Sequence, residues 1–249
     1  MYQFFTDPSQ INIEARRVTI TGEDVNHIRN VLRMKIGEEI NVSNGLDGNE
    51  YRCAIESFEA DSVECELRFV KEDSHELPIK VCLFQGLPKS DKMETIIQKN
   101  VELGVFSIIP VEMKRCVVKL DPKKVQSKIS RWQSISEAAA KQSKRGIIPE
   151  IMAPMSFGEA IDFARNNCDM ILIPYELAED MEATRKVMED IKEGLSIAVF
   201  IGPEGGFDES EINRALDSKT KAITLGSRIL RTETAGMAVM SILMYLTEK

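Results

Sequence analysis

Alternating apolar runs and polar loops organise the C-terminal part of the chain. Residues 198–201 form a continuous apolar run that ends at Gly202-Pro203, as expected of a strand buried on both faces. Asp208 is followed three residues later by Glu211, a capping-box spacing that predicts the start of a helix. The pattern predicts a strand, a tight glycine loop and a helix in succession.

The same order of elements is predicted a second time. Residues 222–225 favour a strand, residues 226–231 a loop, and a helix is expected from about Thr232. The predicted buried stripe of this helix consists of Ala235, Val239, Ile242 and Leu246. Two such loops at the ends of neighbouring parallel strands would form a crevice, which is where open α/β sheets bind ligands.

Upstream segments extend this sheet. An apolar strand from Val81, a helix over about 92–103 and a further strand before MKRCVVKL predict a parallel βαβ unit. The run MILIPYE predicts another buried strand, which Pro174 ends at the expected crevice. Trp132, in a helix that begins near Pro122, is interpreted as a core aromatic residue.

Residues 1 to about 71 have a different pattern, with short alternating segments and turn signals. Asp47-Gly48 between two strand-like runs predicts a hairpin, and the region as a whole suits a small β-barrel. One helix, about 23–34, would place Arg29 and Arg33 on one face, either for a ligand or as a solvated surface. The acidic stretch 71–78 is the predicted linker, so the predicted domains are 1–72 and 78–249.

The charge distribution adds a prediction about partners. The chain of 249 residues has a net charge of −8, but residues 80–149 carry 14 Lys or Arg against 6 Asp or Glu, a local charge of +8. Such a basic region in an acidic protein predicts a polyanionic partner held through phosphates, although a solvated lysine-rich surface would look the same. Five widely spaced cysteines and two histidines favour buried thiols over a metal site. The N-terminus lacks a signal-peptide pattern and no segment approaches eighteen apolar residues, which predicts a cytoplasmic protein.

The loop GPEGG limits the kind of ligand in the crevice. It matches neither the P-loop nor the dinucleotide pattern, and Glu204 would repel a phosphate. A nucleoside with a cationic substituent, such as S-adenosylmethionine, suits an acidic glycine loop better. The alternative is a tight turn with an ordinary surface glutamate.

The chain resembles the RsmE family of SPOUT methyltransferases, through GPEGGF and LGSRILRTETA and through five further stretches. These are HIRNVLRMKIGEEI (27–40), FQGLPKSDKMETIIQKNVELGV (84–105), KRCVVKL (114–120), RWQSISEAAAKQSKRGIIPEI (131–151) and ILIPYE (171–176). The resemblance implies an N-terminal PUA-like β-barrel and an α/β domain with a C-terminal trefoil knot that binds S-adenosylmethionine. It also implies a homodimer that methylates N3 of a uridine in 16S ribosomal RNA, free or in the assembled small subunit, during ribosome maturation.

Methylating N3 of uracil requires alignment, removal of the N3 proton and stabilisation of charge on the uracil oxygens. Arg231 is the candidate for holding that charge, or else it pairs with Glu233 or Glu204. Glu233 is the candidate base, although both carboxylates could instead fix loop N–H groups. The resemblance implies the following cofactor contacts: Pro174, Ile201, Gly202, Glu204, Gly205, Leu225, Gly226, Ile229, Leu230, Thr234 and Ala235. The candidate RNA contacts are Arg29, Arg33, Lys89, Lys92, Arg115, Lys144 and Arg145.

Three positions depart from the family pattern. Ser90, Asn100 and Cys116 stand where glycine, a small or hydroxyl residue, and serine are expected. Two other functions remain open: a non-catalytic RNA-binding protein, and a related SPOUT enzyme that methylates a ribose hydroxyl or another RNA. Intact GPEGG and LGSRILRTETA motifs count against the first of these.

Overall fold

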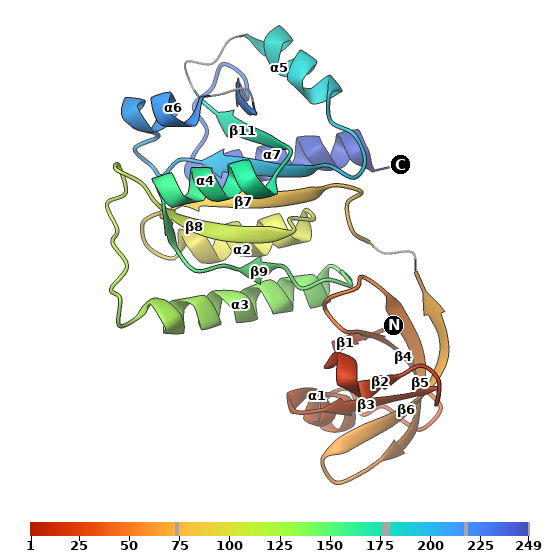
Figure 1. Cartoon of the computed structure of the whole chain (residues 1–249). Coiled ribbons are helices and arrows are strands. Elements are labelled where there is room, and N and C mark those ends of the chain that lie inside the picture. The colour runs from red at the N-terminus through yellow and green to blue at the C-terminus, as the bar shows by residue number, and fades with distance from the viewer. Residues whose placement is uncertain (73–74, 176–179, 217–218, 249) are drawn as a thin grey trace. The chain divides into compact units, whose positions relative to one another are not determined.

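The computed structural model describes residues 1–72, 75–175, 180–216 and 219–248, and the chain divides into two compact units. Unit 1 comprises Met1–Glu76 and Ala140–Ile148, and unit 2 comprises Leu77–Ala139 and Pro149–Lys249. Each unit has a sheet of its own (Figure 1). Residues 73–74 of the predicted linker and Glu176 of the ILIPYE motif lie outside the described residues.

Unit 1 is built on a six-stranded sheet with the order β1-β4-β5-β6-β3-β2. Its strands are β1 (Gln3–Phe5), β2 (Ile11–Asn12), β3 (Arg17–Thr21), β4 (Glu39–Ser43), β5 (Glu50–Phe58) and β6 (Ser62–Lys71). All neighbours are antiparallel except β1 and β4. In β6 the residues Val63, Cys65 and Leu67 are buried while their neighbours are not, which is the alternation expected when one face covers a core.

The predicted hairpin is confirmed, because β4 and β5 pair antiparallel and Gly48 between them has a φ of 75°. The predicted helix is shorter than expected. It consists of α1 (Glu23–Asn26) and a π-helical turn, η2 (His27–Val31). Arg33 follows at a φ of 54°, so it does not share a helical face with Arg29, and that prediction is wrong.

The segment 140–148 joins unit 1 through buried polar contacts. The Arg145 side chain forms an ion pair with Glu76, and the backbone N–H of Ile147 donates to the same carboxylate at 3.2 Å. Lys141 Nζ lies 2.9 Å from Asp24 Oδ1. Contacts over long sequence distances therefore assign this segment to the N-terminal unit, which the predicted split at residues 72–78 does not anticipate.

Unit 2 contains a seven-stranded, fully parallel sheet. Its strands are β7 (Lys80–Gly86), β8 (Ser107–Glu112), β9 (Glu150–Ile151), β10 (Met155–Ser156), β11 (Met170–Pro174), β12 (Ser196–Ile201) and β13 (Thr220–Ile223). The order is β10-β8-β7-β12-β11-β13, and β9 pairs with β8. The sheet confirms the predicted parallel α/β organisation.

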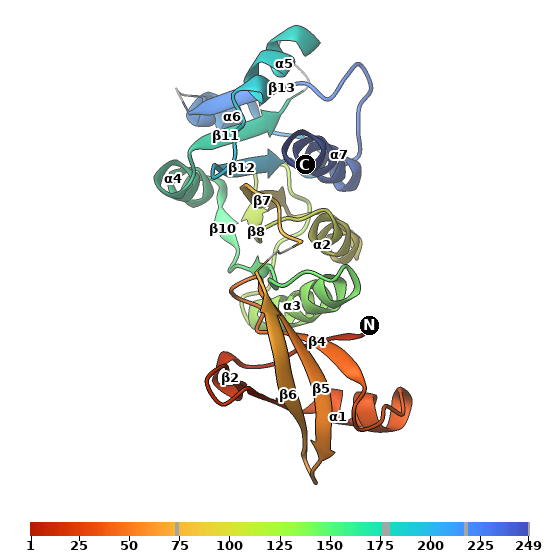
Figure 2. The ribbon, with the colours of Figure 1, turned by 90° about the vertical axis from the view of Figure 1, so that its right-hand side faces the viewer.

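Helices cover both faces of this sheet, with α4 on one side and α2 and α7 on the other (Figure 2). The helices are α2 (Lys92–Glu102), α3 (Val125–Gln142), α4 (Phe157–Asn167), α5 (Met181–Glu189), α6 (Glu209–Ala215) and α7 (Thr232–Thr247). The predicted capping box is present, because Asp208 N–H donates to Glu211 at 2.9 Å and the Asp208 side chain caps α6 in return. Local sequence thus sets where the helix after the glycine loop begins.

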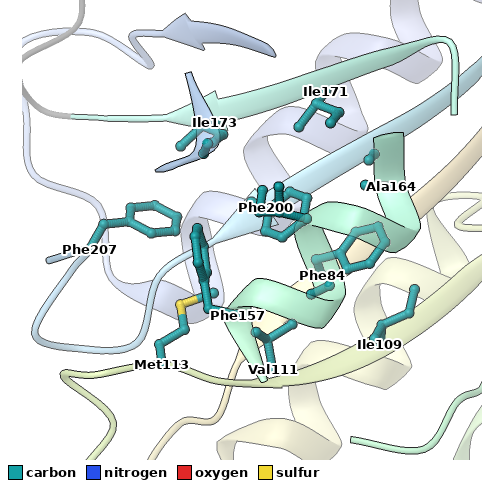
Figure 3. Close-up of a cluster of buried hydrophobic side chains, with 14 of the residues drawn as sticks. Phe84, Ile109, Val111, Met113, Phe157, Ala164, Ile171, Ile173, Phe200 and Phe207 are labelled. Carbon is teal, nitrogen blue, oxygen red and sulfur yellow. The ribbon is translucent and has the colours of Figure 1, made fainter. Parts of the chain in front are cut away.

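Aromatic residues fill the core beneath α4 (Figure 3). The rings of Phe84 and Phe200 stack with centroids 4.4 Å apart, and Phe157 meets Phe200 edge-on. Residues 197–201 of β12 are all buried, as the continuous apolar run predicts. The buried positions of Cys53, Cys65, Cys168 and Trp132 confirm the prediction of core residues there.

The predicted buried stripe of α7 is wrong in part. Val239 is fully buried, but Ile242 and Leu246 are 37% and 47% exposed. The buried residues are Thr232, Gly236, Val239, Met240 and Leu243. Because α7 is apolar on several sides, its sequence pattern does not define a single inward face, and packing against α2 and β12 selects one.

Candidate active site

A pocket of about 1000 Å³ opens in unit 2 at the carboxyl ends of β11, β12 and β13. Residues 201–207 at the end of β12 and 224–232 after β13 form most of its wall, together with Pro174 and Tyr175 at the end of β11. The two loops do not follow neighbouring strands, because β11 lies between β12 and β13. The predicted crevice is present, but three strand ends form it.

Most of the predicted cofactor contacts line this pocket. They are Pro174, Ile201, Gly202, Glu204, Gly205, Leu225, Gly226, Ile229, Leu230 and Ala235. Thr234 is exposed in the first turn of α7 and is not part of the pocket wall. The wall combines loop backbone with apolar side chains such as Ile201 and Phe207, a surface suited to a nucleoside.

The glycine loop is held by the protein itself. A Cβ on Gly205 would lie 3.1 Å from Arg115 Cβ, and Arg115 Nη1 donates to Gly205 O at 3.1 Å. Gly206 has a φ of 67°, a conformation that favours glycine. The close approach at Gly205 is therefore to the segment after β8, and Gly205 also lines the pocket, as its selection as a cofactor contact predicts. Arg115, a predicted RNA contact, braces the loop.

A buried chain of hydrogen bonds fixes the start of the same loop. Gln85 Nε2 donates to Thr232 Oγ1 at 2.8 Å, and Thr232 Oγ1 donates to Gly202 O at 2.7 Å. Gln85 and Thr232 are buried at the end of β7 and the start of α7. Neither residue is among the site residues predicted from the sequence. The available signal was a glutamine at the end of the apolar strand VCLFQG, since a buried amide needs partners.

Lys92 joins Glu204, on the pocket wall, to Glu233, which is not part of the wall. Its Nζ lies 3.1 Å from Glu204 Oε1 and 3.3 Å from Glu233 Oε2, and Lys92 itself lines the pocket. The backbone N–H of Lys89 donates to Glu204 Oε1 at 3.0 Å. The structure therefore places Lys92, a predicted RNA contact, between the candidate base and the glycine loop.

These contacts also shift the pKa values of Lys92 and Glu204. A hydrogen bond from the ammonium to Glu204 raises the pKa of Lys92, with Glu233 contributing in the same direction. Burial alone would raise the pKa of Glu204, but backbone N–H groups and Lys92 outweigh it, so the pKa falls below its usual value. Lys92 is therefore an ammonium and Glu204 a carboxylate at neutral pH.

The candidate catalytic residues lie at the start of α7. Arg231 is the N-cap residue, exposed and on the pocket wall, where the positive end of the helix dipole adds to its charge. Glu233 lies in the first helical turn. The sequence left open an ion pair of Arg231 with either glutamate. In the described part of the chain, Lys92 pairs with both carboxylates.

The remaining RNA candidates have different environments. Lys89, Lys144 and Arg33 are exposed. The Arg29 guanidinium lies 5.4 Å from the centre of the Phe58 ring and donates to Glu59 O. Arg145 is only 2% exposed and is ion-paired with Glu76, so its side chain is not presented to a phosphate and its selection as an RNA contact is corrected.

Comparison with known proteins defines the class. Residues 75–244 match the family described as RNA methyltransferase domain, and residues 20–68 match the RNA methyltransferase PUA domain. The chain is therefore an RNA methyltransferase with an N-terminal PUA-like domain joined to a mixed α/β domain, as the resemblance implies. The implied trefoil knot stays a prediction.

Similar proteins define the family more narrowly. The chain is 38% identical to the ribosomal RNA small subunit methyltransferase E of Bacillus subtilis, over 100% of this chain and 98% of that protein. It belongs to the ribosomal RNA small subunit methyltransferase E family. The Neisseria gonorrhoeae member, solved bound to S-adenosyl methionine, is 30% identical with a TM-score of 0.83, over 99% of this chain and 98% of that one. A Legionella pneumophila methyltransferase solved with the same cofactor is 31% identical with a TM-score of 0.78, over 97% and 96% of the two chains.

Within the described ranges, no helix has both the length and the apolar composition needed to cross a membrane.

Proposed function

We propose that this protein transfers a methyl group from S-adenosylmethionine to N3 of a uridine in 16S ribosomal RNA. The observation that carries the proposal is the pocket at the ends of β11, β12 and β13, where both family motifs meet. The two solved relatives named above support the choice of donor. Ribosomal RNA, free or in the assembled small subunit, is the proposed partner, and the proposed compartment is the cytoplasm.

The pocket residues fit the donor. Loop backbone at Gly202 and Gly226 and apolar side chains such as Leu225 suit the nucleoside part, because adenine recognition needs donors, acceptors and an apolar slot. Glu204 provides the negative charge that favours a sulfonium cation. When bound, S-adenosylmethionine supplies the electrophilic methyl group. The protein's own residues must orient the uracil and accept the proton that leaves its N3.

Arg231 and Glu233 are proposed for these tasks. The uracil N3 proton has to leave, and Glu233 is the proposed acceptor. The exposed Arg231 guanidinium at the helix N-terminus is proposed to stabilise negative charge on a uracil oxygen. Lys92 is an ammonium at neutral pH and does not serve as a base.

The proposed RNA surface uses the exposed basic residues. Arg33, Lys89 and Lys144 are exposed. Arg29 and Arg115 each donate a hydrogen bond to a backbone carbonyl of the protein, but their guanidinium groups remain accessible in part. Their contribution would be mainly to phosphates, which makes binding weaker in salt. Phosphate contacts carry no direct sequence information, so recognition of the target base is expected at the site of methyl transfer.

We also propose a homodimer formed through the outer face of α7. Ile242, Tyr245 and Leu246 lie on adjacent turns of this face, and Tyr245 is 84% exposed. A cluster of this kind is typical of an interface rather than a solvated helix. The variant Tyr245→Glu is expected to shift the protein from dimer to monomer in sedimentation velocity. An unchanged sedimentation coefficient would place the interface elsewhere.

The decisive test of the function is transfer of a labelled methyl group to small ribosomal subunits and to deproteinised 16S RNA. Mass spectrometry of the nucleosides would identify the product, and N3-methyluridine is the expected result. A methylated ribose would assign the protein to another reaction within the same superfamily. Salt-sensitive RNA binding without any transfer would favour the non-catalytic alternative.

A further inference from the structure

Lys92 holds a position that its sequence context does not reveal. It is the first residue of α2, and its Nζ lies within salt-bridge distance of carboxylates from two other elements. Glu204 belongs to the glycine loop and Glu233 to the first turn of α7. One ammonium group therefore links three separate segments at the edge of the pocket.

The neighbouring backbone strengthens this link. The N–H of Lys89 donates to the same Glu204 oxygen that pairs with Lys92, at 3.0 Å. Ser90, between them, has a φ of 55°, so the turn into α2 adopts a left-handed conformation that L-residues rarely take. The connection from β7 to α2 is thus shaped to present both the amide and the ammonium to Glu204.

The ammonium matters to the two carboxylates because both side chains are largely shielded from water. The Lys92, Glu204 and Glu233 side chains are 29%, 27% and 21% exposed. Two carboxylates that face the same point repel each other, and a cation placed between them offsets that repulsion. Besides Lys92 and Glu204, the charged residues that line the pocket, among those that the structure describes, are Asp180 before α5 and Arg228 and Arg231 before α7, whereas Glu233 is not part of the wall. Asp91 lies beside Lys92 as the N-cap of α2.

We propose that Lys92 is a positioning residue for methyl transfer. Its ammonium pairs with Glu204 and Glu233 and holds the glycine loop against the start of α7, which preserves the pocket for a cationic donor. The inference rests on the proposed function, because it assigns Lys92 to the donor side of that site. It also removes Lys92 from the set of RNA contacts, since both carboxylates already engage its Nζ.

The inference makes a pH-dependent prediction. In the wild type, Glu204 has a lowered pKa and stays ionised throughout the range from about pH 5.5 to 8.5. In Lys92→Met, the ammonium that helps to lower the pKa of Glu204 is removed, so the negative charge of Glu204 that favours the donor is lost at a higher pH than in the wild type. Donor affinity of the variant should therefore decline toward acidic pH relative to the wild type.

The experiment measures S-adenosylmethionine binding by calorimetry at several pH values for the full-length protein and its variants. The ratio of wild-type to variant affinity at each pH cancels any titration of the donor itself. The affinity lost in Lys92→Met is expected to be about twofold greater at pH 5.5 than at pH 8, because the carboxylate charge that favours the donor is fully present only at the higher pH. Lys92→Arg retains the charge and should restore most of the affinity. Lys99→Met, which removes an exposed ion pair with Glu102 on the same helix, is the matched control and should match the wild type.

A double variant separates electrostatics from general damage to the fold. Adding Glu233→Gln to Lys92→Met removes the repelling pair and should reduce the acid sensitivity of donor binding, whereas unfolding would not be rescued. Wild-type affinity at all pH values for Lys92→Met, with weakened RNA binding, would overturn the inference and make Lys92 a phosphate contact. Absence of methyl transfer by the wild type would instead count against the proposed function, because donor binding is measured without RNA.

Discussion

At the scale of single residues, burial decides what a charged or small side chain does. Arg145 and Lys144 are adjacent in a basic stretch, yet one is enclosed with Glu76 and the other is exposed. Arg115 contributes its aliphatic part and its guanidinium to the glycine loop. Residue type alone therefore does not separate structural cations from those that contact RNA.

Arg145→Met is expected to destabilise the protein. Removing the cation leaves the Glu76 carboxylate, whose side chain is 13% exposed, without its guanidinium partner, and breaking a buried pair in this way costs about 3 to 5 kcal/mol. The free energy of unfolding in urea would measure the loss. Lys144→Met, one residue away and exposed, is the control and should change stability by less than about 0.5 kcal/mol. Equal stability of both variants would contradict the role assigned to Arg145.

Gly205→Val should abolish donor binding while RNA binding remains. A Cβ at this position already meets Arg115 Cβ at 3.1 Å, and a branched side chain would force the loop and Arg115 apart. We expect donor affinity to fall at least about tenfold, or roughly 1.4 kcal/mol, in calorimetry. Gly205→Ala should give a smaller loss. Unchanged donor affinity in a folded Gly205→Val variant would place the donor site elsewhere.

At the scale of elements, the connections between strands and helices create the site. Residues 202–208 link β12 to α6 and residues 224–231 link β13 to α7, and both loops reach the pocket. Thr232 at the start of α7 hydrogen-bonds to Gly202 at the end of β12. Helix α7 therefore has two roles: its N-terminal residues form part of the pocket wall, and the helix packs against α2.

Gly236→Ala is expected to stabilise α7. Gly236 lies inside the helix, where glycine is about 0.8 to 1.0 kcal/mol less favourable than alanine. The added Cβ would meet Asn100 Oδ1 at 3.4 Å, an ordinary van der Waals contact. The free energy of unfolding should rise by about 0.5 to 1 kcal/mol in a urea titration. A loss of stability would show that α2 and α7 cannot accommodate a methyl group at this contact.

At the scale of the whole molecule, two compact units share one chain. The acidic net charge of −8 coexists with a basic window, and the segment 140–148 of that window belongs to unit 1. The donor pocket, in contrast, is built entirely from unit 2. RNA binding and donor binding should consequently be separable by mutation.

The double variant Arg29→Glu with Arg33→Glu tests this separation. It should weaken RNA binding and reduce the dependence of log affinity on log salt by about 0.7 to 0.9 per lost phosphate contact. Donor affinity should stay at the wild-type value because both residues lie in unit 1. Titrations at several salt concentrations, with calorimetry of the donor, would measure both. Parallel loss of RNA and donor binding would mean that this region has a structural role.

Local patterns by themselves determined the elements around the site. The apolar run before Gly202, the capping box at Asp208 and the βαβ order all depend on nearby residues, so the sequence predicted a parallel sheet with a ligand crevice. The motifs GPEGG and LGSRILRTETA also indicate the family without any knowledge of tertiary contacts. These features were accessible because secondary structure and motif spacing are short-range properties.

Tertiary structure decided which side chains meet. It placed β11 between the two loop-bearing strands, turned Ile242 and Leu246 of α7 outward, and enclosed Arg145. It also brought Lys92 to Glu204 and Glu233, residues separated from it by more than a hundred positions in the chain. No local pattern encodes these outcomes, because strand order, helix rotation and ion pairing depend on packing between segments that are distant in sequence.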